Sequence, residues 1–202
     1  MSRRRVARYG AGMTEAAAAT MWLLVGLPAA GKTTRARALA DERDALRLTP
    51  DDWLLALQWA VEVDDAVRDA LEGRLLDLAI PALRGGVDVV VDFGLWGRDE
   101  RTALRWIAAQ LGARAVVEHL DVDETEQLAR VRARAEDDAR LHIPAEDTRA
   151  WRAQFEAPGA DELAGGPLDP VPEDVGSWGE WAATRWPGLR VVTAEEASRP
   201  RC

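Results

Sequence analysis

The chain has 202 residues, of which 48% are hydrophobic and 30% charged, and its formal net charge is -9. This length and hydrophobic content fit one compact domain with a sizeable core, and the acidic balance argues against broad, sequence-independent nucleic-acid binding, which depends on clustered Lys and Arg. The single cysteine, Cys202, excludes a disulfide or a cysteine-based metal site within one chain and fits a reducing, cytoplasmic location.

Residues 1–20 are expected to be a disordered extension, with Met13 or Met21 as a candidate natural start, and residues 21–202 are expected to be the folded domain. The basic MSRRR and the later apolar MWLLVGLPAA imitate a signal peptide, but polar or small residues separate them and the apolar run continues into GKTT. No stretch approaches the roughly 18 apolar residues of a membrane span. No membrane association is therefore expected.

Short apolar runs alternate with helical segments along the domain. Strands are predicted at 21–25, 45–49, 87–93, 114–122 and 189–193. Helices are predicted at 32–42, 51–60, 64–83, 98–112, 123–135 and 145–157. Pro, Gly and acidic residues predict irregular structure from 158 to 179. The alternation implies right-handed crossovers, so the predicted fold is α/β, with a parallel sheet covered by helices on both faces.

The segment GLPAAGKT, residues 26–33, matches the phosphate-loop pattern G-x-x-x-x-G-K-[ST], and it follows a predicted strand and opens a predicted helix. Its glycines let the backbone aim consecutive N–H groups at one anion, and the helix adds its positive N-terminal end. The alternative is a glycine-rich turn without a ligand. The predicted nucleotide-binding residues of this segment are Gly26, Ala29, Ala30, Gly31, Lys32, Thr33 and Thr34.

Lys32 is the only lysine among 26 basic residues. Arginine is planar and bulky, whereas lysine is a slender point charge that can reach into a closed loop of amides. Lys32 is therefore predicted to be catalytic, with its ammonium on the β and γ phosphates of a nucleotide. The hydroxyl of Thr33 is the predicted ligand of Mg²⁺.

The segment TPDDW places two carboxylates, Asp51 and Asp52, after the second predicted strand, at the sheet edge where ligands bind in open α/β folds. Asp51 is the predicted catalytic base, which orients an acceptor hydroxyl and accepts its proton. Both acids also suit a helix N-cap after Pro50, so one is expected to cap and the other to bind substrate. Trp53 is a candidate for the wall of the substrate pocket.

Asp92 ends the apolar run VDVVVD at the same sheet edge. It is a candidate to bind substrate or to hold Mg²⁺ through water, and Arg98 is a candidate substrate-binding residue. The alternative for the following FGLWGR is a turn whose aromatic side chains simply pack.

Arg130 and Arg134 are four residues apart, so they share one helical face. They are predicted to bind the nucleotide phosphates from a lid around residues 130–145, with Arg134 as a catalytic residue. The alternative is an exposed ion-pair stripe with Glu126, which would contribute only a few tenths of a kcal/mol.

The order of these motifs resembles the small P-loop kinases allied to polynucleotide kinase, zeta toxin and chloramphenicol phosphotransferase. DFGLWGRDER, LARVRAR and FEAPGADE are similar to a bacterial branch of AAA-type ATP-dependent kinases, and the resemblance covers residues 21–162. It implies an adenylate-kinase-like sheet around a central first strand, ATP and Mg²⁺ as cofactors, Asp51 as general base and a lid arginine near 130–134. Two departures stand out. Leu54 follows Trp53 where polynucleotide kinases have an arginine, and Ala135 follows Arg134 where related kinases have asparagine.

These features predict an ATP-dependent kinase that transfers the γ-phosphate to a hydroxyl of a small molecule, such as a nucleoside, a sugar or an antibiotic-like acceptor. A nucleic-acid partner is not expected. The alternatives are a 5′-hydroxyl polynucleotide kinase and an ATP-binding regulatory or toxin-like module with slow hydrolysis.

Overall fold

The computed structural model describes residues 18–57, 63–137 and 145–190. Four parallel strands form its sheet: β1 (Thr20–Val25), β2 (Leu46–Leu48), β3 (Val89–Gly94) and β4 (Arg114–His119). Their order is β2-β3-β1-β4, so the first strand lies inside the sheet between β3 and β4. The predicted α/β class and parallel sheet are confirmed.

The side chains of β1 alternate between two layers of core, as period two requires. Met21, Leu23 and Val25 belong to the larger hydrophobic cluster, whereas Leu24 belongs to a smaller one. All four are at most 1% exposed. Because buried apolar side chains project from both faces of this strand, helices must cover both faces of the sheet.

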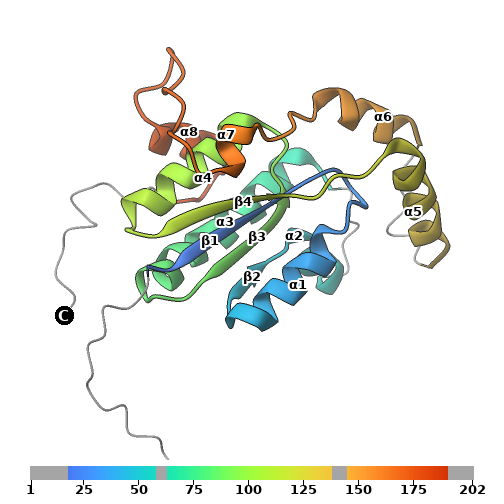
Figure 1. Ribbon diagram of the computed structural model, residues 1–202, viewed down its shortest axis with the longest axis horizontal. Helices are drawn as coiled ribbons and strands as arrows, with labels where there is room; N and C mark the ends of the chain where they lie inside the picture. Colours follow the sequence, from blue (N-terminus) through green and yellow to red (C-terminus); the bar gives the residue numbers. More distant parts are fainter. Residues whose placement is uncertain (1–17, 58–62, 138–144, 191–202) are drawn as a thin grey trace, which may run out of the picture.

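Eight helices lie in the described part of the chain. They are α1 (Lys32–Arg43), α2 (Pro50–Ala56), α3 (Asp65–Arg84), α4 (Arg98–Gln110), α5 (Glu124–Asp137), α6 (Ala145–Gln154), α7 (Ala160–Leu163) and α8 (Trp178–Arg185). Figure 1 shows α1 on one face of the sheet and α4 and α8 on the other, with α5 and α6 beyond the carboxyl end of β4. Within the described ranges, no helix combines the length and apolar character needed to span a bilayer.

The segment predicted to be irregular, 158–179, instead contains the short helix α7 and the first residues of α8. Helix α8 begins at a side-chain cap, since the Ser177 hydroxyl accepts a hydrogen bond from Glu180 N at 3.2 Å. The predicted strand at 189–193 falls largely outside the described residues. So do most of the predicted N-terminal extension and the part of the predicted lid from 138 to 144.

Near its carboxyl end, strand β3 has an irregular pairing with β1 that affects the position of Asp92. Leu23 of β1 pairs with Val91 of β3, but Val25 pairs with Gly94, so β3 has one extra residue between these pairs. Such a bulge bends a strand and re-aims its side chains. Asp92 lies within this irregular stretch and is 6% exposed. It is therefore inside β3 rather than at its end.

Candidate functional site

The phosphate loop follows β1 and leads into α1, as predicted, and both of its glycines are structurally required. A Cβ on Gly26 would lie 2.6 Å from the carbonyl oxygen of Leu120, so only glycine fits there without a backbone shift. Gly31 has φ +101°, a conformation that side chains rarely adopt. Gly31 stands at the N-cap of α1, where amides point toward an incoming anion.

Lys32 folds back over this loop. Its Nζ donates to the carbonyl oxygens of Gly26 at 2.9 Å and Leu27 at 3.0 Å. Burial lowers the pKa of Lys32 to about 8, against the opposing effect of the Asp92 and Asp51 carboxylates. The two carbonyl bonds hold the ammonium at the mouth of the loop, where nucleotide phosphates would meet it.

Asp92 and Thr33 form the oxygen-rich part of the site. Asp92 accepts a hydrogen bond from Thr49 Oγ1 at 3.2 Å, and Thr33 lines the same cavity. Burial raises the pKa of Asp92 to about 6, although Lys32 opposes the shift. A hydroxyl and a carboxylate are hard oxygen donors of the kind that suit Mg²⁺ together with substrate phosphates. These two residues therefore fit the metal that a nucleotide-binding P-loop requires.

The two neighbouring acids of α2 have different surroundings. Asp51 lines the cavity described below, and its Oδ1 lies 3.1 Å from Arg68 Nη1. Asp52 instead forms ion pairs with Arg47 and Arg37. Neither acid caps α2, because Thr49 occupies the N-cap position. The prediction that one of the two acids caps α2 is therefore wrong. Asp52 instead pairs with arginines and does not line the cavity.

A cavity of about 720 Å³ joins the phosphate loop to the Asp51 side chain. Of the predicted site residues, it brings together Ala29, Gly31, Lys32, Thr33, Asp51, Asp92 and Arg134. Its other walls come from the end of β3, the loop after β3, α3, α6 and α8, including Phe93, Trp96 and Trp151. A space of this size accommodates a small molecule.

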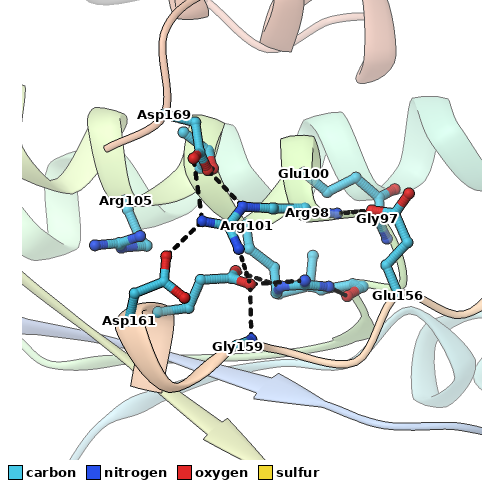
Figure 2. Close-up of polar contacts among 12 residues, drawn as sticks. Gly97, Arg98, Glu100, Arg101, Arg105, Glu156, Gly159, Asp161 and Asp169 are labelled. Atoms are coloured by element: carbon cyan, nitrogen blue, oxygen red, sulfur yellow. Dashed lines mark hydrogen bonds and ion pairs between the residues drawn. The ribbon is translucent and has the colours of Figure 1, made fainter. Parts of the chain in front are cut away.

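Other predicted site residues do not line this cavity. Gly26, Ala30 and Thr34 belong to the loop without contributing to the cavity wall, and Trp53 is 48% exposed. Arg98 does not line the cavity, and its guanidinium group forms ion pairs with acidic residues. It pairs with Asp161, Glu162 and Asp169, and Figure 2 shows its bonds to this group.

The two lid arginines have separate positions. Arg130 Nη1 donates to the carbonyl oxygen of Ala29 at 3.0 Å and also pairs with Glu126. Gln127 Nε2 donates to Pro28 O at 3.0 Å. Helix α5 is thus hydrogen-bonded to the phosphate loop, and only Arg134 of the pair reaches the cavity wall.

Beside Arg98, a fully buried ion pair supports the cavity wall. Arg101 bonds Glu162 twice, through Nε at 2.8 Å and Nη2 at 3.1 Å. Its Nη1 donates to the carbonyl oxygens of Leu95 and Trp96 at 3.0 and 3.1 Å. Because Leu95 and Trp96 line the cavity, this ion pair fixes the loop after β3 (Figure 2).

The sequence analysis missed an acidic wall on α3. Asp65, Asp69 and Glu72 line the cavity at spacings of four and three residues, which places them on one helical face. That spacing was the available signal. Arg185 reaches the same wall from α8 and pairs with Asp69 and Glu100.

Glu72 should make the stability of the protein depend on pH. Burial raises its pKa from 4.5 to about 7, against the influence of Arg185. The folded protein therefore holds this proton more tightly than the unfolded chain does, so the free energy of unfolding falls as pH rises from about 4.5 to about 7. The expected loss is roughly 3 kcal/mol, from about 1.4 kcal/mol per pKa unit.

Urea denaturation at pH 5 and pH 8 measures this effect. Glu72→Gln should flatten the decline and be more stable than wild type at pH 8. The control Asp41→Asn, at an exposed acid of α1, should show the same decline in unfolding free energy as wild type. An unchanged pH dependence in Glu72→Gln would contradict the assignment.

A family model described as "AAA domain" matches residues 21–158, more than half of the chain. No curated protein matches the chain.

Two solved structures resemble it. A chain from "Structure of the Pnkp1/Rnl/Hen1 RNA repair complex" is 18% identical, with a TM-score of 0.52, over 67% of this chain and 43% of the other. A chain from "Structure of Pnkp1/Rnl/Hen1 complex" is 20% identical, with a TM-score of 0.47, over 55% of this chain and 38% of the other. This chain thus spans less than half the length of either neighbour. The first likeness supports the P-loop fold.

Proposed function

The chain belongs to the AAA domain family, and from that premise we propose that it transfers the γ-phosphate of ATP to a hydroxyl group of a small molecule. The observation that carries the proposal is that one cavity is lined both by the phosphate loop with Lys32 and by Asp51. Phosphoryl transfer requires the donor phosphate and an activated acceptor to meet in one space, away from bulk water.

In this mechanism Lys32 and the amides of the phosphate loop hold the β and γ phosphates, and Arg134 neutralises charge from α5. Thr33 and Asp92 would hold Mg²⁺, which neutralises charge on the phosphates when bound. Asp51 orients the acceptor hydroxyl toward the γ-phosphorus and accepts its proton as the new O–P bond forms. The bond between the γ-phosphorus and the β–γ bridging oxygen breaks in the same step, and ADP leaves. Arg68 fixes the Asp51 carboxylate at 3.1 Å.

A 5′-hydroxyl polynucleotide kinase is the second candidate, because the structural neighbour comes from an RNA repair complex. One experiment separates the two candidate functions. The protein is incubated with ATP and Mg²⁺, and with either a small alcohol or a 5′-hydroxyl oligonucleotide as acceptor. Mass spectrometry then reports which compound gains phosphate. The proposal expects a small alcohol. Phosphorylation of the oligonucleotide alone, falling steeply with salt, would replace it.

Asp51→Asn should lower the rate of transfer by about 100-fold to 10,000-fold while ATP binding persists, since general base catalysis is lost and the phosphate loop is intact. Asp52→Asn is the matched control, because Asp52 pairs with Arg47 and Arg37 outside the cavity, and it should change the rate little. Steady-state kinetics and calorimetric ATP titration measure both. Equal losses in the two variants would contradict the role of Asp51.

A further inference from the structure

Two carbonyl oxygens of the phosphate loop are bonded by side chains of α5 that do not line the cavity. Gln127 Nε2 donates to Pro28 O at 3.0 Å, and Arg130 Nη1 donates to Ala29 O at 3.0 Å. Between these two carbonyls, Ala29 has φ +65°, a left-handed conformation that residues other than glycine rarely adopt. Such a conformation persists where the surrounding structure imposes it. The two α5 side chains supply that constraint.

The Gln127 side chain is bonded at both ends of its amide, and the residue is 0% exposed. Its Oε1 accepts a hydrogen bond from Arg152 Nε at 2.7 Å, and Arg152 Nη2 donates to Val122 O at 2.6 Å. A guanidinium group can only donate hydrogen bonds, so its partner must be the oxygen of the amide. Arg152 therefore leaves the NH₂ group of Gln127 directed at Pro28 O.

The bond to Pro28 O also sets the direction of a loop amide. The Pro28 carbonyl and the Ala29 N–H belong to one peptide group, and in a planar trans peptide the N–H points away from the carbonyl. Holding the carbonyl toward α5 thus turns the Ala29 N–H away from α5. Ala29 itself lines the cavity. The next amide is engaged within the loop, because Ala30 N donates to Leu27 O at 3.1 Å.

We propose that Gln127 is a positioning residue for nucleotide binding. By holding Pro28 O, it aims the Ala29 N–H at a phosphate oxygen of bound ATP, where backbone amides serve as anion donors. It acts through the backbone from behind the cavity wall, and Arg152 supports it by fixing its amide. The inference rests on the proposed function, because it requires that the loop bind ATP. It does not depend on which hydroxyl receives the phosphate.

Gln127→Glu tests this role most directly, because it keeps the shape and the bond to Arg152 but places an oxygen against Pro28 O. Calorimetric titration with ATP and Mg²⁺ should give a Kd about tenfold higher than that of wild type, the scale of a buried carbonyl that loses its donor. Gln127→Met removes both amide bonds and should do the same. Tripolyphosphate with Mg²⁺ should lose affinity by the same factor, since the effect acts on the phosphates.

Two further variants separate positioning from stability. Ile107→Val is the control, because Ile107 is a core residue of α4 that does not line the cavity. This variant should unfold at a lower urea concentration than wild type and bind ATP as wild type does. Arg152→Met should weaken ATP binding, but it should add no further loss in the Gln127→Met background, because Arg152 acts through Gln127.

The failures of the two proposals are distinguishable. Affinities of Gln127→Glu for ATP and tripolyphosphate within about twofold of wild type would overturn the positioning role and leave the proposed function standing. A loss confined to ATP would do the same, because it would place the effect at the nucleoside. An additive loss in the double variant would overturn the role of Arg152. Wild-type protein without affinity for either compound would overturn the proposed function, and the positioning role with it.

Discussion

Replacing Lys32 by arginine is expected to lower the rate of phosphoryl transfer by about 100-fold or more, although the charge is conserved. Lys32 Nζ donates to Gly26 O and Leu27 O, inside a loop that Gly26 closes against Leu120. A guanidinium group is planar and wider than an ammonium, so it would displace the loop or point away from the phosphates. Lys32→Met should lose about as much activity.

The control for this pair is Arg37→Lys, the reverse exchange at a residue of α1 with a 62% exposed side chain, which should keep wild-type kinetics. Steady-state assays with ATP and the acceptor, alongside calorimetric titration of ATP, separate loss of binding from loss of turnover. If Lys32→Arg retained activity within about threefold, a loss below 1 kcal/mol, the steric argument would be wrong.

Replacing Arg101 by methionine is expected to lower the free energy of unfolding by about 3–5 kcal/mol, a large part of the stability of a domain this size. The variant leaves the Glu162 carboxylate buried without its partner, and the side chains of both residues are 0% exposed. It also removes the donor that the carbonyl oxygens of Leu95 and Trp96 share. Urea denaturation measures the loss.

Two comparisons sharpen this test. The double variant Arg101→Met with Glu162→Met should recover part of the stability, because no buried charge remains without a partner. Arg98→Met, at a partly exposed arginine of the same helix turn, should cost only about 1 kcal/mol. An Arg101→Met variant as stable as Arg98→Met would show that the buried pair does not hold the loop.

The parts of the fold that were predicted correctly have local signals. The phosphate loop is a contiguous motif, and β1 and β3 are apolar runs whose character follows from burial on both faces. Helix α8 was missed, although Ser177 and Glu180 form the S-x-x-E spacing that often opens a helix. Its glycine and two tryptophans obscured that signal, since the burial of the tryptophans depends on contacts with α4 elsewhere in the chain.

In the site, too, features within one contiguous motif could be predicted, whereas contacts between residues far apart in the sequence could not. The position of Lys32 and Thr33 in the cavity wall could be expected from adjacent residues alone. The contact of Asp51 with Arg68 joins residues 17 apart, and Arg101 meets Glu162 across 61 positions. No spacing rule links residues so far apart. Arg98 was predicted to bind substrate, but it bonds Asp161 and Asp169, more than 60 positions along the chain.

The most direct test of the account follows the fate of the γ-phosphate. ATP labelled at that phosphate is incubated with Mg²⁺, the protein and the acceptor mixture, and the label is then separated between organic phosphate and inorganic phosphate. The account predicts that the label appears on an organic hydroxyl in step with ADP formation, and that Lys32→Met and Asp51→Asn each slow this transfer by about 100-fold or more. Label released only as inorganic phosphate, at a rate indifferent to acceptors and to Asp51→Asn, would contradict the kinase and favour a nucleotide-hydrolysing module.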